Sequence, residues 1–274
     1  MRILAAAVVF VITASPLLFA QWPTFAPPNA PKLADGSVNM AGPPPRTADG
    51  KVDLSGVWET TQGRRGGGPA PIAAEGTGAL PPSGSIFGNV GGQIPGGAPY
   101  QPWAAELVKT RRADNDKDNP DAHCLPMGFM QLHEHVQPRK IVQAPKEMII
   151  MYEGNYGLRE IFMDGRPLPA NDPQPWWFGY SSGQWMGDTL VVETTGFRDG
   201  GWLDVNGSPL TDRARTIERY RRTSYGTMDV EVTVDDPKAY TRPWTVTIRQ
   251  RLMPDEELIE FVCLENEQSS RHFR

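Results

Sequence analysis

The chain has 274 residues, 28 of them Gly and 27 Pro, and a formal net charge of −5 at pH 7. This charge gives no electrostatic footprint for nucleic acid. After the first 20 residues, no segment approaches the run of about 18 apolar residues that a membrane-spanning helix needs.

The N-terminal sequence MRILAAAVVFVITASPLLFA, residues 1–20, has the pattern of a secretory signal peptide. One Arg precedes an apolar run, and small residues follow it. The pattern predicts cleavage after Ala20, with a membrane anchor as the alternative. Because the run is short and leads into a Pro-rich segment, residues 21–52, cleavage is favoured. We therefore expect a periplasmic or secreted protein without a membrane span after cleavage.

Residues 53–274 are expected to form a single β-rich domain. The apolar–polar alternation in VDLSGVWET predicts a first strand. Residues 62–100 are rich in Gly, Pro and Ala, which predicts a long irregular insertion. The sequence QPWAAELVKTRRADN, residues 101–115, predicts a short helix.

From Arg139 onward, apolar and polar residues alternate with a period of two. The predicted strands are RKIVQA, EMIIMYEG, LREIFMD, DTLVVETTGF, RTIERYRR, MDVEVTVD, RPWTVTIRQRL and ELIEFVCLEN, separated by turn sequences such as EGNYG and DDPKAY. In two of them the inward sets are Met228, Val230, Val232 and Val234, and Trp244, Val246, Ile248 and Leu252. Short connections predict an antiparallel meander that closes into a β-barrel with one open mouth, suited to one small ligand.

The two cysteines, Cys124 and Cys263, are predicted to form a disulfide because the chain is expected to be exported. The bond would close a loop of about 140 residues and tie the segment around Cys124 to the last predicted strand. Two reduced core thiols are the alternative.

The segment DAHCLPMGFMQLHEHVQPRK, residues 121–140, holds three of the four histidines. On a strand, His133 and His135 would project from one face, and with His123 they could supply three zinc ligands. The spacing matches no strong metal motif, so the favoured interpretation is a disulfide-linked loop with no metal and no other cofactor.

Aromatic residues gather in WWFGYSSGQWMGDTLVVETTGF, where Trp176, Trp177, Tyr180 and Trp185 lie within ten positions. Such a group is typical of pocket walls for an apolar, aromatic or glycan-like ligand. The alternative is that these rings are buried in the core.

Charged residues at strand positions are candidates for the barrel interior. Arg159 begins one predicted strand, and Glu218 and Arg219 alternate in RTIERYRR. Side chains on a strand alternate between its two faces. Arg219 therefore faces inward if Ile217 does, whereas Glu218 faces inward if Tyr220 does. An inward charge must be paired or hydrogen-bonded, so it would anchor a ligand, act in proton transfer, or form a structural ion pair.

Motifs along most of the chain resemble an uncharacterised family of exported bacterial proteins that is expanded in Acidobacteria and other soil bacteria. The matching sequences are DLSGVW, DNPDAHCLPMG, PRKIVQAP, DGRPLP, SSGQWMGDTLVVETTGF, WLDVNGSPLTD, DDPKAYTRPW and IEFVCLEN. Many members carry His where this chain has Leu210, and some where it has Leu168. The resemblance implies export and one domain, and no particular activity. The SGVW sequence and the meander are also similar to calycin (lipocalin-type) barrels, which concerns fold alone.

Three functional hypotheses follow. The first is an exported barrel that binds a small molecule, with the aromatic group as walls and Arg159 and Arg219 as polar anchors. The second is a secreted lyase, isomerase or hydrolase, with or without a metal ion, that uses His133 or Glu218 as the acid/base and one of these arginines as anchor. The third is a structural or surface-interaction module without a pocket. The sequence contains no phosphate-binding or dinucleotide-binding glycine motif, which argues against nucleotide-dependent chemistry.

Overall fold

The computed structural model describes residues 29–61, 94–169 and 175–265. The predicted signal peptide, residues 1–20, and most of the predicted insertion, residues 62–93, lie outside the described residues. In the described part, no helix combines the length and apolar character needed to cross a bilayer.

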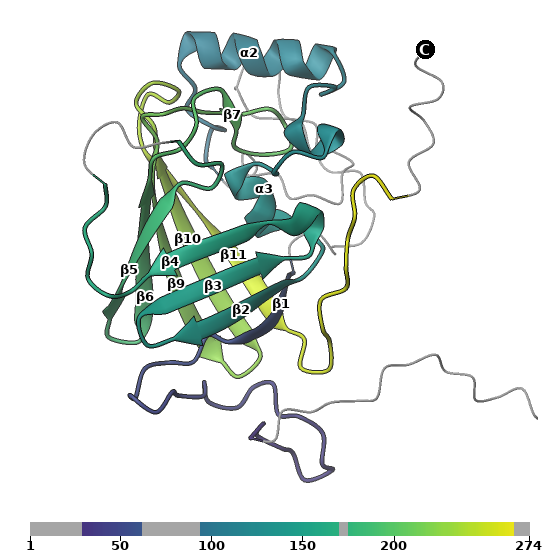
Figure 1. Cartoon of the computed structure of the whole chain (residues 1–274), viewed down its shortest axis with the longest axis vertical. Coiled ribbons are helices and arrows are strands. Elements are labelled where there is room, and N and C mark those ends of the chain that lie inside the picture. Colours follow the sequence, from purple (N-terminus) through teal and green to yellow (C-terminus); the bar gives the residue numbers. More distant parts are fainter. Residues whose placement is uncertain (1–28, 62–93, 170–174, 266–274) are drawn as a thin grey trace, which may run out of the picture.

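Nine strands of the described chain close into one barrel, which confirms the mainly-β barrel prediction (Figure 1). A short hairpin of β7 and β8 leaves the barrel between β6 and β9. The strands are β1 (Gly56–Thr60), β2 (Arg139–Ala144), β3 (Glu147–Tyr152), β4 (Leu158–Phe162), β5 (Tyr180–Met186), β6 (Thr189–Thr195), β7 (Gly201–Trp202), β8 (Pro209–Leu210), β9 (Arg215–Ser224), β10 (Thr227–Asp235) and β11 (Trp244–Leu252).

The barrel contains one parallel strand pair, β4 and β5. Neighbours around a closed ring cannot all be antiparallel when the number of strands is odd, so a nine-stranded meander needs one such pair. The pair has two registered residue pairs, Ile161 with Ser181 and Phe162 with Ser182, fewer than any other neighbouring pair of described barrel strands. Parallel pairing is also slightly weaker per residue. The β4–β5 seam is therefore the least extensively bonded part of the wall.

The strand alternation places apolar side chains inside the barrel. Both predicted inward sets are confirmed, since all eight side chains of β10 and β11 named above are at most 4 % exposed. The helix α2 (Pro102–Ala113) also lies where the sequence predicted one.

One end of the barrel is covered by helices rather than open. The helix α3 (Phe129–Glu134) lies there with all six of its residues buried, below η3 (Pro120–His123) and α2 (Figure 1). The expectation that His133 and His135 lie on a strand was therefore wrong, because both histidines lie at the C-terminal end of a short helix. A second short turn, η4 (Gly154–Tyr156), joins β3 to β4.

The last predicted strand, ELIEFVCLEN, was also wrong. Residues 253–265 contain no strand in the structure. The reason is the closure of the barrel: β11 already pairs with β10 on one side and β1 on the other, so no strand edge is left. We call residues 253–265 the C-terminal strap.

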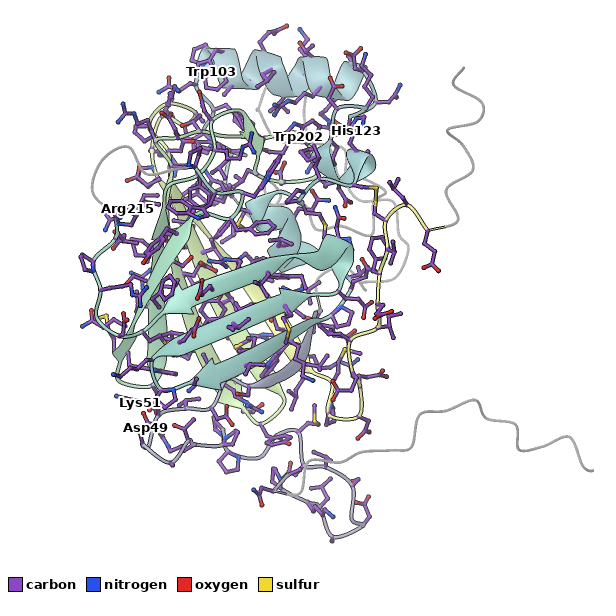
Figure 2. All side chains as sticks on the ribbon, viewed as in Figure 1. Asp49, Lys51, Trp103, His123, Trp202 and Arg215 are labelled. Atoms are coloured by element: carbon purple, nitrogen blue, oxygen red, sulfur yellow. A yellow bond between two sulfur atoms is a disulfide. The ribbon has the colours of Figure 1, made fainter. Side chains whose placement is uncertain are left out.

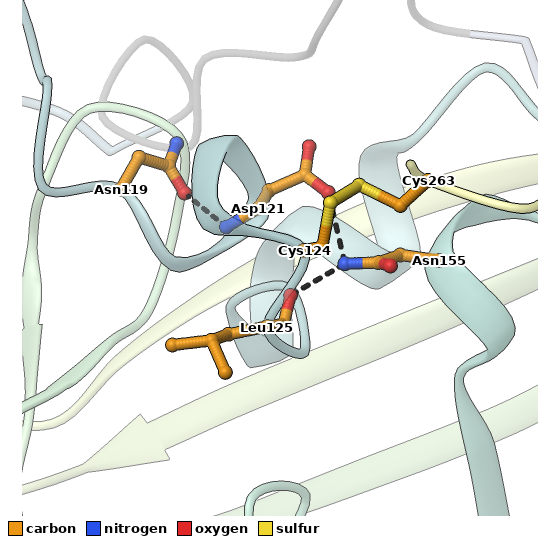
Figure 3. The surroundings of a disulfide bond; sticks show 6 residues. All are labelled: Asn119, Asp121, Cys124, Leu125, Asn155 and Cys263. Carbon is orange, nitrogen blue, oxygen red and sulfur yellow. Dashed lines mark hydrogen bonds between the residues drawn. A yellow bond between two sulfur atoms is a disulfide. The ribbon is translucent and has the colours of Figure 1, made fainter. Parts of the chain in front are cut away.

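The predicted disulfide between Cys124 and Cys263 is confirmed, with Cα atoms 5.6 Å apart (Figure 3). It joins the segment after η3 to the C-terminal strap rather than to a strand. Next to it, Asn155 Nδ2 donates to the carbonyl oxygen of Leu125 at 2.5 Å and to Asp121 Oδ1 at 3.3 Å. The bond closes a 139-residue separation, which contributes about 4–5 kcal/mol in the chain-entropy account.

Candidate functional site

The side chains of β9 alternate between the barrel interior and its outer surface. Glu218 and Tyr220 point inward with exposures of 0 and 1 %. Arg219 points outward and forms an ion pair with Glu231 at 3.2 Å. The prediction of Arg219 as an interior ligand anchor was therefore wrong: the large Tyr220 side chain sets the inward parity, and Ile217 is left half-buried on the outside.

Inside the barrel, Arg159 of β4 and Glu218 of β9 form a two-pronged ion pair. Arg159 Nη1 donates to Glu218 Oε1 at 2.9 Å, and Arg159 Nη2 donates to Oε2 at 2.6 Å. Burial alone would raise the pKa of Glu218, but the charge and hydrogen bonds of Arg159 hold that pKa well below its usual range. Glu218 is therefore ionised at neutral pH.

Two further groups contact the same carboxylate. The hydroxyl of Tyr220 donates to Glu218 Oε1 at 2.6 Å, and His133 Nε2 lies 2.8 Å from that oxygen. Burial lowers the pKa of His133, and the opposing effect of Glu218 does not restore it. The imidazole is neutral at pH 7, and the adjacent carboxylate favours the proton on Nε2. Nδ1 has no hydrogen-bond partner among the described residues, and Nε2 is close to the carboxylate in distance but does not have hydrogen-bond geometry. We call Arg159, Glu218, His133 and Tyr220 the interior cluster.

Arg139, which sequence reasoning missed, fixes the helix that carries His133. It is 2 % exposed, and its guanidinium donates to the carbonyl oxygens of His133 at 2.7 Å and His135 at 3.0 Å. A cation at the C-terminal end of a helix satisfies free carbonyls and interacts favourably with the helix dipole. Arg139 lies two positions before Ile141 on the same strand, and residues two apart share a face. The apolar Ile141 could therefore have identified Arg139 as an inward residue.

A pocket of about 330 Å³ lies at the β4–β5 seam. It brings together four of the six predicted ligand-binding residues. We call it the seam pocket, and it is lined by Pro126, Leu158, Arg159, Glu160, Phe162, Trp176, Trp177, Phe178, Gly179, Tyr180 and Ser181. Trp185 does not reach it and packs against the hydrophobic core instead.

The walls of the seam pocket are aromatic rings in mutual contact. The ring centroid of Tyr180 lies 5.1 Å from the ring centroid of Phe162 and 5.5 Å from that of Trp176. The backbone of Trp176 is held by the residues that follow β6, since its N–H donates to the carbonyl oxygen of Gly196 at 2.9 Å and its carbonyl oxygen accepts from the N–H of Arg198 at 3.0 Å. These contacts keep the wall in place without a bound ligand.

The base of the seam pocket touches the interior cluster. Arg159 Nη2 lies 3.3 Å from Ser181 Oγ, and Ser181 Oγ lies 2.9 Å from Thr194 Oγ1. Both Arg159 and Ser181 line the pocket although each is at most 2 % exposed. The hydroxyl groups and both Nη atoms of Arg159 are thus already hydrogen-bonded within the protein, whereas Arg159 Nε has no hydrogen-bond partner among the described residues.

The three histidines of the alternative zinc site do not come together. His123 lies outside the barrel on η3, where its Nε2 is 2.7 Å from the carbonyl oxygen of Lys117 (Figure 2). His135 accepts from the N–H of Gln137 at 3.2 Å, and His133 faces the barrel interior. Across the described ranges, no three His, Cys, Asp or Glu side chains are grouped as metal ligands.

Comparison of the chain with protein-family models, curated proteins and solved structures finds no match. The function is therefore argued from the geometry of the seam pocket and the interior cluster.

Proposed function

We propose that this protein binds a small apolar or aromatic molecule in the seam pocket. The observation that carries the proposal is the convergence of Trp176, Trp177 and Tyr180 on one cavity whose base is Arg159. Its volume, about 330 Å³, lies at the lower end of the range for small-molecule sites.

The hydrogen bonding at the base favours an aromatic ligand over a glycan-like one. A sugar needs several free polar partners, but Arg159 is bonded to Glu218 through both Nη atoms and Ser181 is bonded to Thr194, so Arg159 Nε is the unpaired donor at the base within the described residues. The ring faces, in contrast, offer large flat apolar areas that a planar ligand can stack upon. The positive charge of Arg159 is balanced by Glu218, so the ligand needs no anionic group.

The interior cluster acts in this proposal as the rigid support of the pocket. Arg159 contacts Glu218 on β9, Ser181 on β5 and the ring of Phe129 on α3, 4.7 Å from its guanidinium carbon. It therefore links the two strands of the seam to the rest of the barrel. Fixed walls reduce the ordering cost of binding.

The disulfide is compatible with an oxidising compartment. Together with the signal pattern of residues 1–20, it supports the proposal that the protein is exported, as in the bacterial family whose motifs it resembles.

The test uses 1-aminoanthracene, a neutral aromatic probe whose fluorescence increases in apolar sites. We expect saturable binding, and we expect a loss of about tenfold or more in affinity in the Trp176→Ala/Trp177→Ala double variant, because two stacking surfaces are removed. Trp103→Phe is the matched control, since Trp103 is exposed on α2 outside the pocket. Equal affinities of the double variant and the wild type would refute the proposal.

A second candidate function, acid–base catalysis, is favoured by His133. Its Nε2 faces a carboxylate while its Nδ1 has no partner among the described residues, which is the arrangement of an oriented general base. His133 does not line the seam pocket, so substrate access would require displacement of α3. Unchanged turnover of a binding compound after His133→Ala and Glu218→Ala would eliminate this candidate.

A further inference from the structure

A second and larger cavity, of about 700 Å³, lies between the C-terminal strap and the barrel residues of β1 and the ends of β9 and β11. We call it the strap groove. It does not share a lining residue with the seam pocket. Its apolar lining comes from both sides, from Val57, Tyr225 and Leu252 on the barrel and from Met253, Leu258 and Ile259 on the strap.

The strap is held in place along its length, so the groove is formed in the free protein. It leaves the barrel at Leu252, which pairs with Trp58 of β1, and it is fastened by Cys263 at its far end. Between these points, Lys140 Nζ lies 2.5 Å from Glu257 Oε2, and the N–H of Ile259 donates to a carboxylate oxygen of Glu153 at 3.1 Å.

The charge of the groove is negative. Four carboxylates, Asp53, Asp255, Glu256 and Glu257, and two cations, Lys140 and Arg222, line it, which gives a net charge of −2.

Both cations are already engaged by the protein. Lys140 pairs with Glu257, and the Arg222 guanidinium donates to the carbonyl oxygens of Asp53, Ser224 and Tyr225. An anionic ligand would find these donors occupied, whereas Asp255 and Glu256 are exposed at the groove.

An aromatic ring lies beside these carboxylates. Tyr225 lines the groove and is 5 % exposed. Burial raises its pKa, the positive charge of Arg222 lowers it, and the negative charges of Asp53 and Asp255 raise it. Arg222 already lies over this ring, with its guanidinium carbon 5.1 Å from the ring centroid, so the ring adds apolar surface to the groove. Recognition of a cation then rests on the exposed carboxylates Asp255 and Glu256 beside the apolar lining.

We propose that the strap groove binds a small organic cation with an apolar body. The apolar body packs between Leu252 and Leu258, and the positive charge lies next to Asp255 and Glu256. This site is independent of the seam pocket and of the ligand proposed there.

The test uses the cationic aromatic dye thioflavin T at low ionic strength, with binding followed by its fluorescence. We expect the Asp255→Asn/Glu256→Gln double variant to bind about fourfold more weakly, because each exposed, partly screened charge contributes about a twofold effect. Glu260→Gln is the matched control, since Glu260 is an exposed carboxylate of the same strap that does not line the groove. Its affinity is expected to equal that of the wild type.

Two further measurements separate the groove from other sites. The Trp176→Ala/Trp177→Ala variant is expected to keep full affinity for the dye, and the Cys124→Ser/Cys263→Ser variant is expected to lose affinity because one wall is no longer fastened. The proposal is overturned if wild-type binding is not saturable, if the Asp255/Glu256 variant binds like Glu260→Gln, or if the tryptophan variant abolishes binding.

Discussion

Replacing Glu218 with Gln removes the negative charge to which Arg159 is bonded inside the barrel. Both side chains are at most 2 % exposed, so water cannot replace the lost partner. Breaking a buried ion pair from one side costs about 3–5 kcal/mol because an uncompensated charge stays behind. The hydroxyl of Tyr220 also loses its charged acceptor, and His133 loses the carboxylate next to its ring. We therefore expect Glu218→Gln to lower the free energy of unfolding by about 4 kcal/mol.

The assay is urea denaturation of the oxidised protein, followed by tryptophan fluorescence and circular dichroism at pH 7. A double-mutant cycle adds Arg159→Met and the Arg159→Met/Glu218→Gln variant. We expect the double variant to lose less than the sum of the single variants, since it leaves no unpaired charge. The matched control is the exposed pair Arg219–Glu231, whose disruption by Glu231→Gln should cost less than about 1 kcal/mol. A cost for Glu218→Gln as small as that of Glu231→Gln would refute the reasoning.

Three other predictions concern stability. Burial and the charge of Asp204 raise the pKa of Glu134 to about 8, above its unfolded value, so its contribution is present at low pH and is lost as pH rises from about 4.5 to 8. Glu134→Gln should therefore gain stability relative to the wild type across that window, measured by denaturation from pH 5 to 8; a constant difference would contradict the assignment. Cys124→Ser/Cys263→Ser should lower the free energy of unfolding by about 3–5 kcal/mol, and an unchanged urea midpoint would contradict the role of the disulfide. Gly56→Ala should cost about 1–3 kcal/mol in the same assay, because Gly56 has φ +133° and a Cβ there would lie 2.6 Å from a Leu side chain of β11; a neutral effect would show that β1 relaxes.

The period-two pattern was sufficient to predict most of the barrel. In β10 the apolar residues alternate without exception, and in β11 the buried Gln250 is the one interruption, so both the strands and their inward faces follow from the sequence. The same pattern failed at ELIEFVCLEN, because local alternation cannot show that β11 has both neighbours already. The pattern also missed α3. All six residues of this helix are buried, so the sequence lacks the contrast between an apolar face and an exposed polar face that would mark a helix.

The candidate site was predicted in part. The density of rings around Trp176 identified the wall of the seam pocket, and Arg159 was recognised as a charge on an inward strand position. The pairing of Ser181 with Thr194 could not be predicted, because it depends on the register between β5 and β6. The ambiguity between Glu218 and Arg219 needed the packing of Tyr220 to resolve it.

The most direct test of the proposed function is a crystal structure of the protein grown with saturating 1-aminoanthracene. We predict electron density for one probe molecule at the β4–β5 seam, in contact with the rings of Trp176, Trp177 and Tyr180 and next to Arg159. Density for the probe elsewhere, or a seam filled by protein side chains with no probe bound, would contradict the account.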